Sequence, residues 1–559
     1  MKRIILIIII LFLLSSNIAY GISIKEQNID KINDDSSDLP SYFSWRDIDG
    51  VDYTTPIRLQ QPYHSCETFA FVAALETMVQ WEVGYPFGCD LSEAHLFFCS
   101  NGNLDWGSYP ENDTNYLVEH GIPDEACFPY PKDKKQYYPK DSCPCWQKRS
   151  VKIKNWSYLP ANNITAIKKA LINNGPVPTH LNVYFDYRYY LGGYVYRHIW
   201  GESLALHLVC IVGYKDDPKI PSGGYWIVKN SWGSEWGEDG WFRIAYGEAS
   251  IEEMPVYFEG VYGNFPIIFV DDDNIIGPWD GSKEHPYKNI STAIDNAYEG
   301  WTIYVKNGIY NENLIIDKKI NIDGENRENT IIDGNQNGIV IYVQKPNVRI
   351  SGLTIQNSGK NRLDSGIRTL HLDSSLTVTN CIIKDNDVGI YLNCVHNEKY
   401  LDSKNIIKNN IIKNNNIGIF TTWVNNNEIS NNIIENNTIY GIETEASEKS
   451  RIEKNIIKNN GQIGIYLHGA SDENEIINND FLENNFGIKL RETKKTKINN
   501  NNFIDNNIHA TFEKSYLNNW NNNYWDDHLN ILPHMIKGKM TNFNLPWYNF
   551  DFVTKINPI

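Results

Sequence analysis

The second half of the chain repeats itself, and this repeat restricts the possible folds more than any other feature of the sequence. Gly-Ile doublets or close equivalents recur at seven positions, and four of the six intervals between them are 23 residues long. The positions are Gly338, Gly366, Gly389, Gly418, Gly441, Gly464 and Gly487, and Ala510 continues the series. Each unit also carries two apolar residues followed by an Asn pair, as in 411–415 and 456–460. A period in the low twenties with short β runs predicts a parallel β-helix with one coil per repeat.

In such a coil we expect Ile to stack inside, while Asn forms ladders at the turns and adopts left-handed backbone conformations. Leucine-rich repeats share the period but need a Leu-x-x-Leu-x-Leu frame, which is absent. The pattern resembles the right-handed β-helix repeats of surface proteins and of carbohydrate-binding or carbohydrate-cleaving proteins. Because the repeats offer mostly Asn and Lys and few clustered carboxylates, we expect binding or spacing here and not catalysis. A calcium site at 271–273 is the alternative for the acidic residues there.

In the first half, Cys66 opens an apolar helix directly after a polar loop that contains Gln60. A thiol at a helix N-terminus lies against unpaired N–H groups and the positive end of the helix dipole, and both favour the thiolate. The amide of Gln60 and the backbone N–H of Cys66 are a candidate pair of oxyanion donors. This arrangement predicts a nucleophilic cysteine, whereas a lone Cys without partners is more often a buried structural thiol.

The partners of this thiol come later, in two apolar, β-rich runs at 206–214 and 225–233. The loop between them is rich in Asp, Pro and Gly, so the runs are predicted to pair as antiparallel strands. Pairing places His207 beside Asn230, where the amide can orient the imidazole. This is the arrangement of a Cys-His-Asn triad. His64, two residues before Cys66, is a rival base, but no orienting residue lies near it.

Together these motifs resemble the papain-like cysteine peptidases, an α+β fold, over about residues 39–258. The matching stretches are Leu39-Pro40, 43–46, the Gln60-to-Cys66 spacing, Leu91-Ser92-Glu93 and 229–241. The resemblance implies Cys66 as nucleophile, His207 as general base and acid, Asn230 as orienter and Gln60 as oxyanion donor. It also implies that Trp232 shields the His–Asn contact from water, and that Tyr109 and Pro110 line a substrate pocket.

Three departures from that family bear on rate and specificity. Glu67 stands where the family usually has Trp, and a carboxylate beside a thiolate is expected to raise the pKa of the thiol. Tyr63 replaces a common disulfide cysteine, and Leu206 replaces a polar residue before the histidine. None of these changes removes a triad member.

The N-terminal segment, the cysteines and the net charge together predict an exported protein. Lys2 and Arg3 precede an apolar run and a small-residue cleavage site, which predicts a signal peptide at 1–21; an uncleaved anchor is the alternative. Nine cysteines suit an exported chain, in which disulfides can form. Cys89 is a candidate partner of Cys99, and Cys127 is a candidate partner of Cys143 or Cys145. A zinc site at Cys143 and Cys145 is a weaker alternative. The net charge of −17 argues against nucleic acid as a partner.

The sequence therefore predicts a multidomain protein: signal peptide 1–21, flexible linker 22–38, papain-like domain 39–263, parallel β-helix 264–515 and C-terminal cap 516–559. The predicted function is that of a secreted or cell-surface cysteine endopeptidase without cofactor or metal. Its partners are peptide substrates, together with a surface or glycan bound by the β-helix. The alternatives are a non-catalytic adhesin and a carbohydrate-active β-helix protein with a degenerate peptidase domain. The change of composition near Asn264 also predicts that the two halves are separable.

Overall fold

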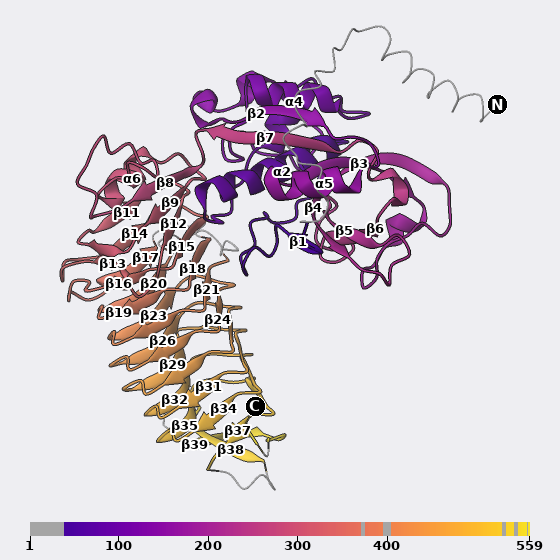
Figure 1. Cartoon of the computed structure of the whole chain (residues 1–559). Helices are drawn as coiled ribbons and strands as arrows, with labels where there is room; N and C mark the ends of the chain where they lie inside the picture. The colour runs from indigo at the N-terminus through magenta and orange to yellow at the C-terminus, as the bar shows by residue number, and fades with distance from the viewer. Residues whose placement is uncertain are drawn as a thin grey trace. The chain divides into compact units, whose positions relative to one another are not determined.

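The computed structural model describes residues 39–369, 375–394, 404–527, 533–540, 546–555 and 557–558 (Figure 1). Contacts divide the chain into two compact units. The first, here called the sheet unit, comprises Met1–Asp52 and Trp156–Glu259, and the second, here called the helix–solenoid unit, comprises Tyr53–Asn155 and Gly260–Ile559. The predicted signal peptide and linker lie outside the described residues.

A five-stranded antiparallel sheet organises the sheet unit. Its strands follow the order β1-β4-β5-β6, and β3 also pairs with β4. The predicted pairing of 206–214 with 225–233 is confirmed, because Cys210 of β4 lies opposite Lys229 of β5. Apolar residues of this sheet, such as Trp226 and Phe242, form a buried core with α5. The elements are β1 (Tyr42–Ser44), α5 (Ile164–Asn173), β3 (Val177–Tyr184), η5 (Asp186–Tyr189), β4 (Ser203–Asp216), β5 (Gly224–Lys229), β6 (Trp241–Ala245) and η6 (Glu248–Ser250). Strands β2 (Val151–Tyr158) and β7 (Val256–Gly263) cross from one unit into the other.

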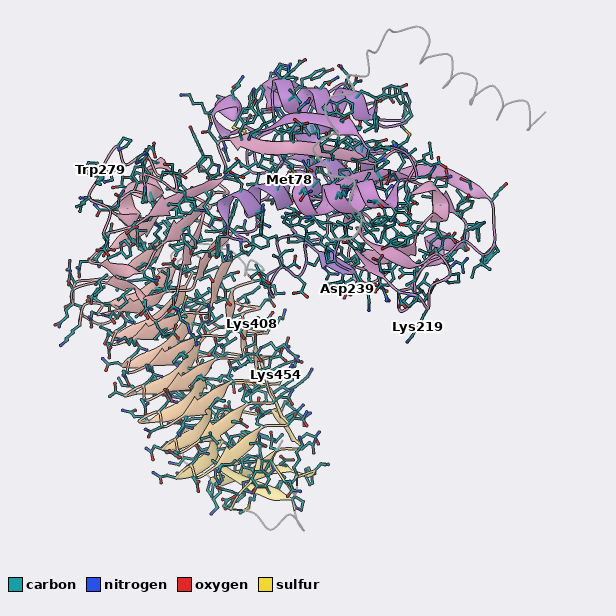
Figure 2. The ribbon with its side chains drawn as sticks, viewed as in Figure 1. Met78, Lys219, Asp239, Trp279, Lys408 and Lys454 are labelled. Atoms are coloured by element: carbon teal, nitrogen blue, oxygen red, sulfur yellow. A yellow bond between two sulfur atoms is a disulfide. The ribbon has the colours of Figure 1, made fainter. Side chains whose placement is uncertain are left out.

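The helix–solenoid unit begins with helices, of which α2 (Cys66–Val83) is the longest. This helix is buried on most sides, and Met78 lies within it (Figure 2). It ends at Gly84, whose φ of 77° lies in the left-handed region that glycine adopts without a Cβ penalty. The others are α3 (Glu93–Cys99), α4 (Pro110–Glu119), η3 (Pro139–Asp141), η4 (Trp146–Arg149) and α6 (Ile290–Asn296). None of the described helices is long and apolar enough to cross a bilayer.

Three parallel sheets form the solenoid, which confirms the predicted parallel β-helix. The strands stack as successive rungs along the solenoid (Figure 1). The first sheet contains β10 (Gly308–Tyr310), β13 (Thr330–Asp333), β16 (Thr354–Gln356), β19 (Ile382–Lys384), β22 (Ile411–Lys413), β25 (Ile433–Glu435), β28 (Ile456–Lys458), β31 (Asp480–Leu482), β34 (Asn502–Ile504) and β37 (Tyr524–Trp525).

The second sheet contains β11 (Leu314–Ile316), β14 (Ile341–Val343), β17 (Ser365–Thr369), β20 (Val388–Asn393), β23 (Ile417–Thr422), β26 (Tyr440–Glu445), β29 (Ile463–His468), β32 (Phe486–Arg491), β35 (Ile508–Glu513), β38 (His534–Lys539) and β39 (Pro546–Asp551). The third contains β8 (Ile267–Val270), β9 (Thr302–Val305), β12 (Asn321–Gly324), β15 (Val348–Ser351), β18 (Leu376–Thr379), β21 (Ile406–Lys408), β24 (Glu428–Ser430), β27 (Arg451–Glu453), β30 (Glu475–Ile477), β33 (Lys497–Asn499) and β36 (Asn519–Asn521). Exposed lysines such as Lys408 and Lys454 lie on the solenoid surface (Figure 2).

The Asn pairs explain how one coil is joined to the next. The first Asn of a pair, such as Asn459, is left-handed with φ of 52°, and the second, Asn460, is buried. Asn460 donates from Nδ2 to Oδ1 of Asn484 at 3.0 Å, and its own Oδ1 accepts from Nδ2 of Asn437 at 2.9 Å. These bonds confirm the predicted ladder. Because each buried amide satisfies the next, polar turns are compatible with a core of stacked Ile.

A second ladder ends at the C-terminal residues. Asn501 donates to Asn523 at 3.0 Å, and Asn523 donates to the buried carboxylate of Asp551 at 2.8 Å. The indole of Trp525 donates to the same carboxylate oxygen at 3.2 Å. Asp551 ends β39, which pairs with β38 antiparallel, in contrast to the parallel rungs. The ladder therefore ends at the carboxylate of Asp551, which accepts the last amide hydrogen bond and needs no further Asn as a partner.

Candidate active site

Cys66 is the first residue of α2, as the sequence predicts, and its side chain is partly exposed. The preceding residue, Ser65, is fully buried, and its carbonyl accepts a bond from Thr68 Oγ1 at 3.0 Å. The side chain of Ser65 does not cap the helix. The side chain of Ser65 therefore leaves the first-turn N–H groups of α2 uncapped, and the positive end of the helix dipole, which favours negative charge, lies at Cys66.

Glu67 contacts the sulfur of Cys66 directly. The thiol donates to Oε2 of Glu67 at 3.3 Å. Burial raises the pKa of the Glu67 carboxyl, while bonds from its own backbone and from Cys66 act in the opposite direction. In the sequence, only the adjacency of the two residues indicates this contact. A hydrogen bond from the thiol to a carboxyl group stabilises the protonated sulfur, which opposes formation of the thiolate.

Gln60 and the loop before α2 are held by Tyr130. The hydroxyl of Tyr130 donates to the carbonyl of Gln60 and lies 2.7 Å from Oγ of Ser65. The amide of Gln60 lies 3.5 Å from the carbonyl of Tyr63, at the outer limit of a hydrogen bond. Sequence reasoning missed Tyr130, because its distance of 65 residues from Ser65 gives no pattern that links the two.

His207 and Asn230 are brought together by β4 and β5 of the sheet unit. Nε2 of His207 lies 2.8 Å from Oδ1 of Asn230, and both side chains are buried. The N–H of Ser231 donates to the same Oδ1 at 2.8 Å. Since Oδ1 only accepts, Nε2 of His207 carries the proton and Nδ1 of the neutral ring carries the lone pair. The imidazole is thereby held in the tautomer that can take up a proton at Nδ1.

Trp232 packs on this pair. Its ring stacks on the His207 ring with centroids 4.8 Å apart and an interplanar angle of 27°. Burial lowers the pKa of His207 to about 4, and the hydrogen bond with Asn230 acts in the opposite direction. Among the described residues, Nδ2 of Asn230 is buried without a hydrogen-bond partner. The sheet unit therefore holds a neutral, oriented and desolvated imidazole.

The segment from Trp106 to Asp113 lies against the nucleophile loop within the helix–solenoid unit. A Cβ on Gly107, whose φ is 104°, would come within 2.8 Å of the carbonyl oxygen of His64, so only glycine fits. Ser108 donates to Oδ2 of Asp113 at 2.6 Å, which ties the segment to α4. Burial raises the pKa of Asp113 to about 8, against the lowering effect of its hydroxyl donors.

The two predicted pocket residues differ in exposure. Tyr109 is 56% exposed and contacts the ring of Trp106 at 5.3 Å. Pro110 is buried as the first residue of α4, a position that proline favours without any ligand. Tyr109 is thus available to a substrate, whereas the place of Pro110 is explained by the helix it begins.

The rival base His64 and two further histidines, His198 and His180, have other surroundings. His64 is exposed on its loop. His198 stacks on Tyr184 at 3.7 Å, and its Nδ1 lies 3.1 Å from Asp186. Burial lowers the pKa of His180 to about 4. None of these three has an orienting amide comparable to Asn230 among the residues that the structure describes.

The cysteines settle the two open pairings. Cys127 and Cys143 lie at disulfide distance, with Cα atoms 5.0 Å apart. At this distance from Cys127, Cys143 is placed to form a disulfide, which disfavours the zinc alternative at Cys143 and Cys145. Cys89 and Cys99 carry free thiols, so the pairing considered for them does not occur.

The acidic residues at 271–273 do not form an open cation site. Lys306 Nζ lies 3.1 Å from Oδ2 of Asp271, and Asp272 Oδ2 accepts the N–H of Ile309 at 3.0 Å. The pairing of Asp271 with a lysine disfavours the calcium alternative at these residues.

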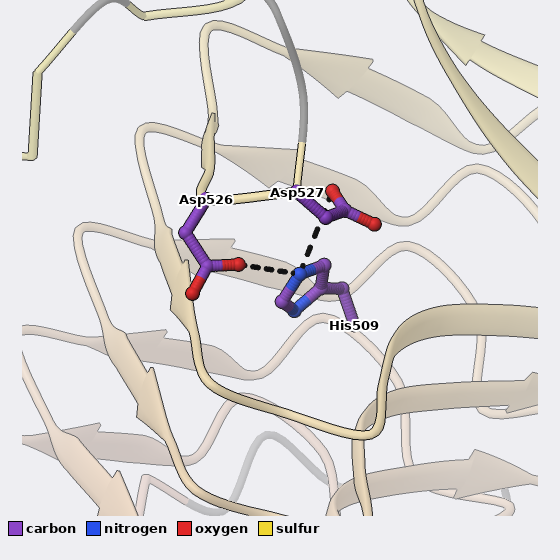
Figure 3. Close-up of side chains that lie close together, drawn as sticks. All are labelled: His509, Asp526 and Asp527. Atoms are coloured by element: carbon purple, nitrogen blue, oxygen red, sulfur yellow. Dashed lines mark ion pairs between the residues drawn. The ribbon is translucent and has the colours of Figure 1, made fainter.

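One group of potential metal ligands occurs among the described residues, at the last coils of the solenoid (Figure 3). Nε2 of His509 lies 2.8 Å from Asp526 and 3.5 Å from Asp527. Nδ1 of His509 lies 3.3 Å from Nδ2 of Asn506, whose Oδ1 is already fixed as an acceptor by Asn484. An amide donor facing Nδ1 places the proton of neutral His509 on Nε2, where it donates to Asp526. The group is a hydrogen-bonded pair with a second carboxylate nearby.

Comparisons with known proteins match two parts of the chain to two families. Residues 39–259 match the family described as Papain family cysteine protease, and residues 294–544 match that described as Periplasmic copper-binding protein (NosD). Cathepsin J of Mus musculus is 32% identical over 233 residues, which cover 39% of this chain and 66% of that protein, just under two thirds. Cathepsin Z of Onchocerca volvulus is 30% identical over 229 residues, covering 38% of this chain and 72% of that protein. Cysteine proteinase 2 of Entamoeba histolytica is 32% identical over 231 residues, covering 40% and 69%.

The NosD description implies copper, and the described solenoid residues do not fit that metal. Copper sites draw on imidazole, thiolate and thioether ligands. The one candidate group offers a single imidazole whose Nε2 is a hydrogen-bond donor, together with two carboxylates. Cys381 of the solenoid is buried, and burial raises the pKa of its thiol to about 12, which disfavours the thiolate.

The predicted resemblance is confirmed in both halves. The helices of the helix–solenoid unit and the sheet unit together supply the region that matches the protease family, and the solenoid supplies the region that matches NosD. Relatives at 30% identity or more are matched over two thirds or more of their length. The chain therefore belongs to the papain family of cysteine proteases and carries a NosD-type parallel β-solenoid.

Proposed function

We propose that the protein is an exported cysteine endopeptidase that hydrolyses peptide bonds with Cys66 as nucleophile, His207 as base and acid, and Asn230 as orienter. The bond between His207 Nε2 and Asn230 Oδ1 is the observation that carries this proposal. It leaves the Nδ1 lone pair of a neutral imidazole as the proton acceptor. Family membership supports the same assignment, because the protease match covers all three residues.

In the proposed reaction, His207 Nδ1 takes the proton of the Cys66 thiol, and the sulfur attacks the carbonyl carbon of the substrate. Gln60 Nε2 and the Cys66 N–H donate to the oxyanion that forms. As the C–N bond breaks, His207 returns its proton to the leaving amine, and a thioester remains on Cys66. Water then attacks the thioester, His207 takes its proton, and the thiol is regenerated as the carboxylic acid leaves.

The solenoid is proposed to hold the enzyme on a surface or glycan. Solenoids present long regular surfaces suited to such partners, and exposed lysines line this one. Export is supported by the apolar run after Lys2 and Arg3 and by the periplasmic description of the second family. Retention of Cys66→Ala protein on isolated cell-wall glycan tests the attachment without interference from proteolysis.

The second candidate is a surface-binding protein whose peptidase domain is inactive. The bond from the Cys66 thiol to Glu67 favours it, because this bond opposes thiolate formation. Hydrolysis of a denatured protein substrate separates the two candidates. We expect turnover by the wild type, none by Cys66→Ala, and normal folding of both. Absence of turnover by the wild type over pH 4 to 8 would favour the inactive candidate.

A further inference from the structure

The first turn of the solenoid contacts a buried ion pair of the peptidase region, formed by Arg149 and Asp124. Arg149 and Asp124 have side chains only 5% and 3% exposed, and Nε of Arg149 donates to Oδ2 of Asp124 at 2.7 Å. The indole N–H of Trp301 donates to the same Oδ2 at 3.1 Å. Arg149 also donates to the carbonyl of Glu299 at 2.7 Å, and its guanidinium lies 4.9 Å from the ring centre of Tyr298. Solenoid residues 298–301 therefore supply further hydrogen bonds to both charged groups and an aromatic ring beside the guanidinium.

The two backbones also approach closely at this place. Gly300 has φ of 86°, and a Cβ on it would lie 2.7 Å from the Cβ of Ala126. A side chain at 300 is thus excluded both by conformation and by space. The backbones around Gly300 and Ala126 are therefore closely packed against each other.

The same peptidase segment holds the loop in front of Cys66. Two residues after Asp124 comes Ala126, and between them Glu125 accepts the backbone N–H of Tyr130 at 2.5 Å. The hydroxyl of Tyr130 bonds the carbonyl of Gln60 and Oγ of Ser65. A continuous path of hydrogen bonds and backbone thus runs from Trp301 to Gln60, which carries one proposed oxyanion donor, and to Ser65, which directly precedes the other at Cys66.

A second contact holds the other end of α2. Lys283 Nζ donates to the carbonyl of Val83 at 2.8 Å, a favourable place for a cation at a helix C-terminus. Just beyond the helix, Tyr85 donates to Asp323 at 3.3 Å, and Asp323 is held by Arg349 at 2.7 Å. The helix that begins at Cys66 is therefore attached to the solenoid at its far end as well.

We propose that Trp301, through Asp124 and Tyr130, is a positioning residue for the nucleophile loop, so that the opening coil of the solenoid sets the alignment of Gln60 and Cys66. The inference rests on the proposed function. Trp301 touches neither substrate nor Cys66. Its indole N–H fixes one oxygen of Asp124 and thereby the 124–130 segment on which Tyr130 is carried.

The test is a pair of matched substitutions in the full-length protein, with kcat and KM measured on a small peptide. Trp301→Phe removes the N–H and keeps an aromatic ring, and we expect kcat to fall about tenfold with KM changed less than about twofold. Trp520→Phe is the control, because the Trp520 indole N–H is buried in a late coil with no hydrogen-bond partner among the described residues. We expect its kcat to equal that of the wild type.

Tyr130→Phe tests the other end of the path. It should lower kcat by a similar factor, and the double variant with Trp301→Phe should lose little more than the larger single loss, because both act on one element. Should Trp301→Phe fail to fold, Tyr298→Leu, which removes only the ring beneath Arg149, is expected to lower kcat in the same way. Equal kcat for Trp301→Phe and Trp520→Phe, or fully multiplicative losses in the double variant, would overturn the inference. An inactive wild type would instead count against the proposed function.

Discussion

Nε2 of His207 lies 2.8 Å from Oδ1 of Asn230, both side chains are buried, and Trp232 stacks on the His207 ring. Asn230→Ala is expected to lower kcat by one or more orders of magnitude, because the ring loses its fixed tautomer and orientation while the base itself remains. His207→Ala should cost more. Steady-state kinetics on one peptide substrate compare the two variants. Equal losses, or none for Asn230→Ala, would argue against an orienting role.

The bond from Cys66 to Glu67 makes a prediction about pH. A charged carboxylate beside the sulfur raises the pKa of the thiol, so Glu67→Gln should lower that pKa and speed alkylation near neutral pH. The measurement is the rate of iodoacetamide reaction against pH, with Cys66→Ala as the background. If the midpoint of the profile is unchanged in Glu67→Gln, the carboxylate does not control the thiol.

Asp113 is expected to make the protein less stable as pH rises. Burial raises its pKa from 3.8 to about 8, so between these values the folded protein binds a proton that the unfolded chain has released. Its contribution is complete below about pH 4 and is lost as pH rises towards 8, with a slope of up to about 1.4 kcal/mol per pH unit. Urea unfolding of Asp113→Asn against pH should show a flatter profile over this range, because an amide does not titrate there. Asn keeps a donor and an acceptor for Ser100 and Ser108, so the variant is expected to fold. An identical slope in both proteins would refute the assignment.

The Asn ladder predicts a large difference between buried and exposed asparagines. Asn460→Ala removes the Oδ1 that accepts from the backbone and side-chain N–H groups of Asn437, and the Nδ2 that donates to the carbonyl of Ile434. We expect a loss of about 2–3 kcal/mol in the free energy of unfolding. Asn507→Ala is the control, since Asn507 is exposed and bonds only Asn485 through its side chain; its effect should be within about 0.5 kcal/mol. Similar losses for the two variants would show that the ladder does not stabilise the solenoid.

The repeat and the strands that carry the triad residues could be predicted from sequence, because local sequence patterns determine both. The Asn pairs specify one left-handed residue and one ladder residue, as Asn459 and Asn460 illustrate. The apolar runs around His207 and Asn230 specify strands, and the polar loop between them specifies their antiparallel pairing. In each case, periodicity or proximity along the chain carries the information.

Contacts between distant segments could not be predicted in this way. No sequence pattern around Asp124 or Arg149 indicates a contact with Trp301, and none around Tyr85 indicates a hydrogen bond with Asp323. The expectation of separable halves rests on the change of composition near Asn264, on the position of all four proposed catalytic residues before residue 231, and on repeats that bury Ile against neighbouring coils. The buried ion pair completed by residues 298–301 argues against it, because a chain ending near Asn264 would leave Arg149 and Asp124 without the solenoid groups that bond them.

The most direct test of the central claim is labelling with an epoxide that traps nucleophilic thiolates, followed by peptide mapping. Three other free cysteines, Cys89, Cys210 and Cys381, serve as internal controls, because they are buried and burial raises the pKa of their thiols. We predict one label per molecule, on the peptide that contains Cys66, with complete loss of peptide hydrolysis. Label on another cysteine, or hydrolysis that persists after Cys66 is fully modified, would contradict the assignment of Cys66 as the nucleophile.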